Sequence, residues 1–356
     1  MQLLELLYQK EFKNIPFISR KLSIAEDSKV ILCGTSGSGK TFLVYDYLQF
    51  ESYGSYLYID FDDFRVSGIT KDKLEKFCDE KKITTLVLEN FDFAFEPPDV
   101  LKLIITSKKK LYHDGYVTKI LYPLDFEEFT SFEKKFISEQ VSFNNFSRKG
   151  TYPHIALSSE ESFEKNFNLM LKATFRDELE FFIVRYLSKK QGSIVTLLGL
   201  FKELKEQVKI SKDKFYAVMK NLENQLFIFF VPKYGVSSYS KKLYLVDFAI
   251  RGIVSYEKDF LKRFENIVFL ELLKRDEKIF YHDRIDFVLP EKSTAITTIL
   301  FLPKQMIEQK INLLLPIIKS LGLIKLKVIT LESEFEFERD GITCEVLTFW
   351  SFVFGL

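Results

Sequence analysis

Residues 34–41 read G-T-S-G-S-G-K-T and match the pattern G-x-x-x-x-G-K-[S/T] at every fixed position. Glycines let a backbone turn tightly and aim its N–H groups at one point, where they can surround phosphate oxygens. The lysine of this pattern reaches the β- and γ-phosphates of a nucleotide, and the hydroxyl after it ligates Mg²⁺. The pattern therefore predicts a nucleotide-binding loop formed by Gly34, Thr35, Ser36, Gly37, Ser38, Gly39, Lys40 and Thr41.

The flanking residues suit such a loop. Lys29–Cys33 is a short apolar run typical of a buried parallel strand, and Phe42–Leu48 can continue as a helix. A helix that begins at the loop directs its positive N-terminal end toward an anion. A plain glycine-serine turn is the alternative, but it explains neither the lysine and threonine nor the strand and helix in register with them.

Composition narrows the class of protein. A chain of 356 residues predicts two or three domains. The 51 basic and 50 acidic residues leave a formal net charge of +1, so no global field attracts nucleic acid or an anionic membrane. Its three cysteines lie far apart without metal-binding spacing, which favours a reduced, cytoplasmic protein. Because no apolar run approaches the roughly 20 residues that span a bilayer, we expect no membrane contact.

Short apolar runs and charged, helix-like stretches such as Thr70–Lys81 alternate after the loop. This alternation predicts an α/β domain with a parallel sheet and helices on both faces. The expected strands are Ser55–Ile59, Thr84–Leu88, Leu101–Thr106 and Lys119–Tyr122.

Two of these strands end in an acid that could organise Mg²⁺. Asp60 ends the first of them, about 20 residues after Lys40, and Glu89 ends the next, about 50 residues after it. The larger separation is usual for a metal-organising carboxylate, so we expect Glu89 to hold Mg²⁺ together with Thr41. An ordinary carboxylate in a solvated loop is the alternative for Glu89.

The residue after Glu89 bears on hydrolysis. Many hydrolysing proteins place a glutamate there to polarise the attacking water, whereas this chain has Asn90. An amide does not accept a proton at neutral pH, so Asn90 cannot act as a base. We name Glu89 and Asp92 as the candidate catalytic acids, with Asp92 as the substitute for the missing glutamate.

Two further features concern the γ-phosphate. Thr106 and Ser107 end a strand and are candidates to contact it, although such a pair also commonly forms a turn. Arginine is scarce, since residues 1–150 contain only Arg20, Arg65 and Arg148, and none is assigned as an arginine finger.

Several segments together resemble one group: predicted prokaryotic ATPases of the AAA superfamily in which a winged helix and a restriction-endonuclease-like domain follow the phosphate-binding domain. The resemblance covers nearly the whole chain and implies an ATP- and Mg²⁺-binding domain at 1–150, a helical and winged-helix domain at 151–253 and a nuclease-like α/β domain at 254–356. Besides the loop, the segments are Leu103–Ser107, Leu121–Phe129, Gly150–Pro153, Phe264–Leu273 and Ile285–Leu289.

The chain departs from that group at two places. The usual Asp-Glu pair is Glu89-Asn90 here, and the arginine that commonly precedes the proline-leucine-phenylalanine signature is missing from Leu111–Tyr122. Both departures favour slow hydrolysis, or a switch that responds to nucleotide binding.

The predicted winged helix contains two amphipathic helices, Ile194–Gln207 and Lys212–Asn224, followed by two strands, Leu226–Pro232 and Leu243–Val246. Residues 201–220 carry six lysines against three acids, and such charge can bind DNA phosphates. The predicted wing adds Lys233, Lys241 and Lys242 to this positive charge. Packing of the winged helix against neighbouring domains is the alternative to DNA binding, and we favour it slightly.

The C-terminal domain carries an incomplete set of nuclease residues. Glu271 and Asp286 are candidates for the first two metal ligands, but the next strand, within Ala295–Leu302, has neither the carboxylate nor the lysine that nuclease chemistry needs. We therefore expect an inactive nuclease fold used for packing or for binding a partner. For Glu271, an ordinary helix-surface or paired residue is the alternative that we favour.

These observations predict a slow AAA-type ATPase that acts as a nucleotide-gated switch. One alternative is a non-hydrolysing DNA-associated or scaffold protein that uses bound ATP for stability. A small-molecule kinase ranks last, because Leu101–Tyr122 lacks an arginine-bearing lid. Oligomeric rings are common among such ATPases, although the scarcity of arginine weakens that expectation here.

Overall fold

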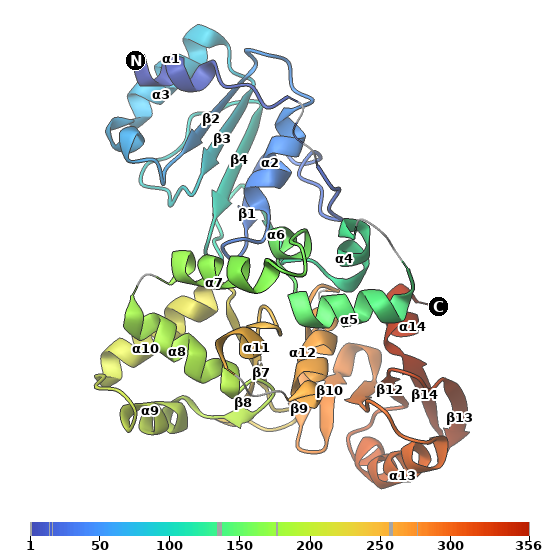
Figure 1. Ribbon diagram of the computed structural model, residues 1–356. Coiled ribbons are helices and arrows are strands. Elements are labelled where there is room, and N and C mark those ends of the chain that lie inside the picture. The colour runs from blue at the N-terminus through green and yellow to red at the C-terminus, as the bar shows by residue number, and fades with distance from the viewer. Residues whose placement is uncertain are drawn as a thin grey trace. The chain divides into compact units, whose positions relative to one another are not determined.

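The structure, a computed structural model, describes residues 2–13, 15, 17–133, 137–175, 177–255, 259–275 and 277–355. The chain divides into two compact units. The first contains Met1–Pro123 and Asn224–Leu226, and the second contains Leu124–Glu223 and Phe227–Leu356. Figure 1 labels the helices and strands of both units.

The first unit contains a five-stranded parallel sheet with the strand order β2-β3-β4-β1-β5. Strands β1 to β4 are buried along most of their length, as expected for a parallel sheet that is covered on both faces. Strand β4 lies between β1, which precedes the loop, and β3, which ends in Glu89. The strands are β1 (Lys29–Cys33), β2 (Tyr56–Asp60), β3 (Thr85–Glu89), β4 (Lys102–Ser107) and β5 (Val117–Ile120).

Side chains alternate across this sheet, so β1 contributes to a core on each face. Ile31 and Cys33 pack in one core with residues of α1 and α3, whereas Val30 and Leu32 pack in the other with residues of α2. Figure 1 shows α2 alongside the blue and teal strands of the sheet. The helices are α1 (Gln2–Tyr8), α2 (Lys40–Leu48), the 3-10 helix η1 (Phe64–Gly68) and α3 (Lys71–Lys81).

The predicted α/β sheet is confirmed, and its strands begin and end within two residues of the expected positions. The largest shift concerns the run expected at Lys119–Tyr122, where β5 begins at Val117 and ends at Ile120. This edge strand pairs on one side only and is the least buried of the five, so its apolar pattern is the weakest guide to its ends.

The second unit begins with helices. Residues 124–150, which we expected to complete the first domain, belong to this unit. The chain enters α4 through a capping box in which the Asp125 carboxylate accepts from the N–H of Glu128. The helices are α4 (Phe126–Phe132), α5 (Glu139–Lys149), α6 (Pro153–Ala156) and α7 (Phe163–Thr174).

A helix, a short strand, two helices and two further strands follow, and the three strands form one sheet in the order β6-β8-β7. The two predicted helices and the two predicted wing strands are present. Sequence analysis missed the helix before them and the strand β6. The elements are α8 (Glu178–Lys189), β6 (Ile194–Val195), α9 (Leu197–Lys205), α10 (Lys212–Asn224), β7 (Ile228–Pro232), β8 (Lys241–Leu245) and α11 (Ile250–Val254).

The C-terminal part is a mixed six-stranded sheet with the order β13-β14-β12-β11-β10-β9. The helix α12 precedes an antiparallel β9-β10-β11 meander, and α13 then leads to β12, which is parallel to β11. The elements are α12 (Phe260–Leu273), β9 (Phe280–His282), β10 (Ile285–Leu289), the 3-10 helix η2 (Pro290–Lys292), β11 (Thr294–Thr298), α13 (Lys304–Ser320), β12 (Lys325–Thr330), β13 (Phe335–Arg339), β14 (Ile342–Thr348) and α14 (Phe349–Phe354).

Candidate functional site

The predicted loop connects β1 to α2 and depends on its glycines. Gly37 and Gly39 have φ angles of 82° and 100°, a region that glycine adopts without strain. At Gly34, a Cβ atom would lie 2.4 Å from the carbonyl oxygen of Leu121, so no larger residue fits there without movement of the backbone. The backbone therefore requires glycine at each of these positions.

The interior of the loop suits an anion. Gly39 precedes α2 and provides no side-chain cap, so the N–H groups of the first turn are not satisfied by a capping residue. The Ser38 hydroxyl is buried and has no hydrogen-bond partner among the described residues. These groups fit phosphate oxygens, which accept hydrogen bonds from N–H and hydroxyl donors.

Lys40 folds back over the loop. Its ammonium donates to the carbonyl oxygens of Gly34 at 2.7 Å and Thr35 at 3.0 Å. Burial lowers the pKa of Lys40 to about 8, and the negative charge of Glu89 partly opposes that shift. A bound phosphate would add negative charge and favour the ammonium form.

Thr41 and Glu89 are in contact, although 48 residues separate them. The Glu89 carboxylate accepts hydrogen bonds from the hydroxyls of Thr41 and Tyr58. Glu89 is buried, and its burial raises the pKa of the carboxyl. Burial and the charge of Glu89 also raise the pKa of Tyr58. The two residues expected to organise Mg²⁺ are thus brought together, and Tyr58 is a neighbour that sequence analysis missed.

Thr106, Ser107 and Asp92 are the remaining residues that the sequence nominated for this site. The Thr106 hydroxyl oxygen accepts from the N–H of Asn90 at 3.0 Å. Ser107 is half-buried, and its carbonyl oxygen accepts from the N–H of Gly34 at 3.2 Å, so β4 ends beside the loop. Asp92 is exposed, and the carboxylate that contacts Asn90 is instead that of Asp60.

Lys10 is a further cation near these acids. Its ammonium lies 4.6 Å from the ring centroid of Tyr58 and 5.0 Å from that of Phe12. Burial lowers the pKa of Lys10, and the charges of Glu89 and Asp60 oppose the shift. Sequence analysis missed Lys10 because nothing near it in the chain marks it, and only the fold brings it toward the strand ends.

The three arginines between residues 1 and 150 all make contacts within the chain. Arg20 donates to the carbonyl oxygens of Ser38 and Tyr122, each at 2.8 Å, and so braces the loop. Arg65 pairs with Asp63, and Arg148 pairs with Glu160 at 2.9 Å. Arg20 is therefore part of this unit's own loop structure.

The two acids considered as metal ligands in the C-terminal domain take part in separate contacts. Glu271 is buried and accepts from the backbone N–H of Phe126 at 2.9 Å, so it closes the N-terminus of α4. Asp286 is instead bridged to Glu265 through Lys242, whose ammonium lies 2.6 Å from Glu265 and 3.3 Å from Asp286. Glu271 is thus a paired residue, as the favoured alternative predicts, and Glu265 on the same helix is the acid that shares Lys242 with Asp286.

This cluster contains one cation and two anions. The hydroxyl of Thr298 on β11 donates to Asp286 at 2.8 Å, at the strand where the nuclease pattern would require a further carboxylate. Among the described residues, no three histidine, cysteine, aspartate or glutamate side chains gather in a way that could hold a metal ion. The cluster is thus an internal ion pair between β8 and the C-terminal sheet.

Two of the three wing lysines are engaged in the same way. Lys233 lies 2.6 Å from Asp283, and Lys242 is buried in the cluster just described. The lysines of α10 remain exposed, although Lys214 also lies 3.4 Å from a carboxylate oxygen of Asp177. The three lysines are Lys212, Lys214 and Lys220.

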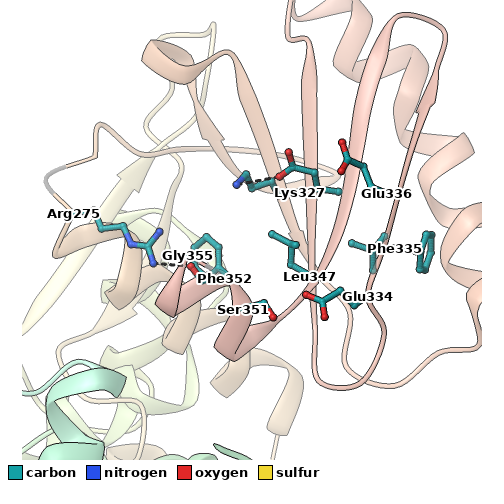
Figure 2. Close-up of a pocket in the computed structure, with 11 residues that line it drawn as sticks. Arg275, Lys327, Glu334, Phe335, Glu336, Leu347, Ser351, Phe352 and Gly355 are labelled. Atoms are coloured by element: carbon teal, nitrogen blue, oxygen red, sulfur yellow. Dashed lines mark hydrogen bonds and ion pairs between the residues drawn. The ribbon is translucent and has the colours of Figure 1, made fainter.

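A cavity of about 470 Å³ lies against β13, β14 and α14 (Figure 2). Its charged groups are largely occupied, because Lys327 pairs with Glu345 at 3.1 Å and Arg275 donates to the carbonyl oxygen of Phe352 at 2.9 Å. Residues 34–41 do not line this cavity, and no ligand chemistry follows from its mixed rim.

No family model matches the chain. An uncharacterized protein of Methanocaldococcus jannaschii is 23% identical over an alignment of 386 positions, which covers 90% of this chain and 87% of the relative. No helix in the described part of the chain combines the length and apolar character needed to cross a membrane.

Proposed function

We propose that the protein binds Mg²⁺–ATP at residues 34–41 and acts as a slow AAA-type ATPase or nucleotide-gated switch. The contact between Thr41 and Glu89 carries the proposal, because it joins a potential metal-ligating hydroxyl to a buried carboxylate beside the loop. The backbone hydrogen bond between Gly34 and Ser107 supports it, since it brings the end of β4 beside the loop.

Each residue then has a defined task. The loop N–H groups and Lys40 hold the phosphates, and Thr41 and Glu89 hold Mg²⁺ and its water shell. Bound Mg²⁺ neutralises charge that develops on the phosphate oxygens. Thr106 or Ser107, at the end of β4, contacts the γ-phosphate. Loss of that phosphate removes the contact and changes the order of the loops.

For the second unit we propose a winged helix joined to an inactive nuclease-like domain. The helix-meander-helix-strand order of α12 to β12 supports the nuclease-like assignment. Inactivity follows from the presence of Lys242 between the two acids and of Thr298 on the neighbouring strand. The three cysteines are buried and unpaired, which supports a cytoplasmic location.

The proposal is tested by titration with a fluorescent ATP analogue, with and without Mg²⁺. The wild type should bind, and Lys40→Ala should lose about 100-fold in affinity, as expected for two charge-assisted hydrogen bonds. Lys76→Ala, on the exposed side of α3, is the matched control and should bind normally. A folded Lys40→Ala protein, verified by circular dichroism, that still binds ATP tightly would disprove the loop assignment.

The exposed lysines of α10 favour one second candidate, a DNA-associated protein that uses ATP only for stability. We expect weak DNA retention, because Lys233 and Lys242 are paired with acids of the same unit. Gel-shift measurements at several salt concentrations distinguish the candidates. Strong, salt-sensitive retention that disappears in a Lys212→Ala/Lys214→Ala/Lys220→Ala protein would favour the DNA-associated candidate.

A further inference from the structure

Asn90 stands where a catalytic carboxylate is expected, and a carboxylate on the adjacent strand lies beside it. The side-chain amide of Asn90 donates to Oδ1 of Asp60 at 2.9 Å. Asp60 ends β2 and is paired in register with Glu89, which ends β3. A carboxylate therefore lies one hydrogen bond away from the position where sequence analysis finds only an amide.

Asn90 is held in one conformation by its backbone. Its φ angle is 55°, in the left-handed region that asparagine and aspartate tolerate better than other non-glycine residues. Its N–H donates to the Thr106 hydroxyl oxygen of β4 at 3.0 Å. Both ends of the residue are thus fixed, so the amide presents a defined donor to Asp60.

Asp60 also belongs to the electrostatic surroundings of the site. Its negative charge contributes to raising the pKa of Glu89, after burial, and acts on Lys10 as well. Its Oδ1 accepts a second hydrogen bond, from the N–H of Asp62 at 3.0 Å. The residue is only half-buried, so water has access to the strand end where its carboxylate lies.

We infer that Asp60, oriented by Asn90, is the carboxylate that activates water for ATP hydrolysis, an inference that rests on the proposed function. The water oxygen forms a bond to the γ-phosphorus while the bond from that phosphorus to the β,γ-bridging oxygen breaks. The electron pair of the broken bond stays on ADP. Asp60 accepts the water proton and later releases it to solvent, so the products are ADP, phosphate and a proton. Asn90 acts as a positioning residue.

The inference is tested by exchanging the two side chains. Asp60→Asn keeps the shape and one acceptor oxygen but removes the base. Its turnover should fall by about 100-fold or more, while ATP affinity changes little. Asn90→Asp alone places two carboxylates against each other and should not increase turnover. The double variant Asp60→Asn/Asn90→Asp restores one amide and one carboxylate, and it should recover at least about tenfold over Asp60→Asn.

Three readouts are taken on each protein: ATP affinity, turnover, and the fraction of bound nucleotide that remains ATP after acid quench. Asp60→Asn should retain unhydrolysed ATP, whereas Asp72→Asn on the exposed side of α3 should behave as wild type. If the wild-type protein binds ATP but does not hydrolyse it, the inference is overturned while the proposed nucleotide binding stands. Unchanged turnover in Asp60→Asn, or a loss confined to Asp92→Asn, would also overturn it. Absence of ATP binding by the wild type would instead refute the proposed function.

Discussion

The ammonium of Lys242 lies 2.6 Å from Oε1 of Glu265, and each of these side chains is only 9% exposed. Burial alone would lower the pKa of Lys242, but the charges of Asp286 and Glu265 together raise it. The lysine therefore stays charged and compensates two acids that have little access to water. The strand β8 and the helix α12 are joined by this pair.

Replacement of Lys242 by methionine should destabilise the second unit by about 3–5 kcal/mol at neutral pH, because both acids would lose their counter-charge. Urea unfolding followed by circular dichroism measures this change. The double variant Lys242→Met/Glu265→Gln should recover part of the loss. An unchanged midpoint in Lys242→Met would mean that solvent already screens the cluster.

The second unit should also lose stability as the pH rises from about 4 to 7. Burial raises the pKa of Asp247 to about 6 and those of Glu265 and Glu271 to about 7. A raised pKa means that the folded state binds the proton more tightly than the unfolded state. The corresponding stability is complete below the unfolded-state pKa and is lost as the pH rises through the folded-state value.

Each of these shifts corresponds to at most about 3 to 4 kcal/mol. Urea unfolding between pH 4.5 and 8 measures the slope, and Glu271→Gln should flatten it while Glu336→Gln, at an exposed site, should not. Carboxylates whose pKa is lowered, such as Asp63 and Asp177, act in the opposite direction below about pH 4. A slope of the opposite sign in the 4.5–8 window would contradict the prediction.

Gly150 is required by Asp247. At Gly150, a Cβ would lie 2.4 Å from both carboxylate oxygens of Asp247, and the φ angle is 82°. The same carboxylate accepts from the N–H of Thr151 at 2.6 Å, so it has little freedom to move away. Because Gly150 also has a ψ angle of −159°, a combination that essentially only glycine adopts, Gly150→Ala should destabilise the protein by at least about 1–3 kcal/mol.

Gly235→Ala is the matched control. Gly235 also has a positive φ, 72°, but a Cβ atom there would have no heavy atom of the described residues within 4 Å. Thermal unfolding of the two variants compares a positive-φ glycine that is crowded by a carboxylate with one that is not. Equal melting temperatures would show that the Asp247 contact relaxes without cost.

Removal of Arg20 should weaken ATP binding without affecting the Thr41–Glu89 pair. Its guanidinium holds the carbonyl oxygens of Ser38 and Tyr122, so its loss releases the back of the loop. We expect Arg20→Ala to lose about tenfold in ATP affinity, equivalent to one to two hydrogen bonds. Arg65→Ala, which breaks an exposed pair, is the control. If the two variants bind equally well, Arg20 does not order the loop.

The sequence alone determined the local features of the first unit. The loop glycines, the buried strand before them and the spacing to Glu89 follow from backbone geometry and apolar periodicity, which neighbouring residues define. In the second unit the helical periodicity of Lys212–Asn224 and the run Ile285–Leu289 likewise matched α10 and β10. Such features depend on contacts within a few residues, so they can be read along the chain.

Only the tertiary structure decided which charged groups meet. Asp60 reaches Asn90, and Lys242 reaches Glu265, because strands and helices distant in sequence pack side by side. Periodicity could not separate Glu265 from Glu271, since both lie on the same buried helix. Pairing of ionisable side chains depends on the three-dimensional register of separate elements and on their burial, and neither quantity is encoded in local spacing.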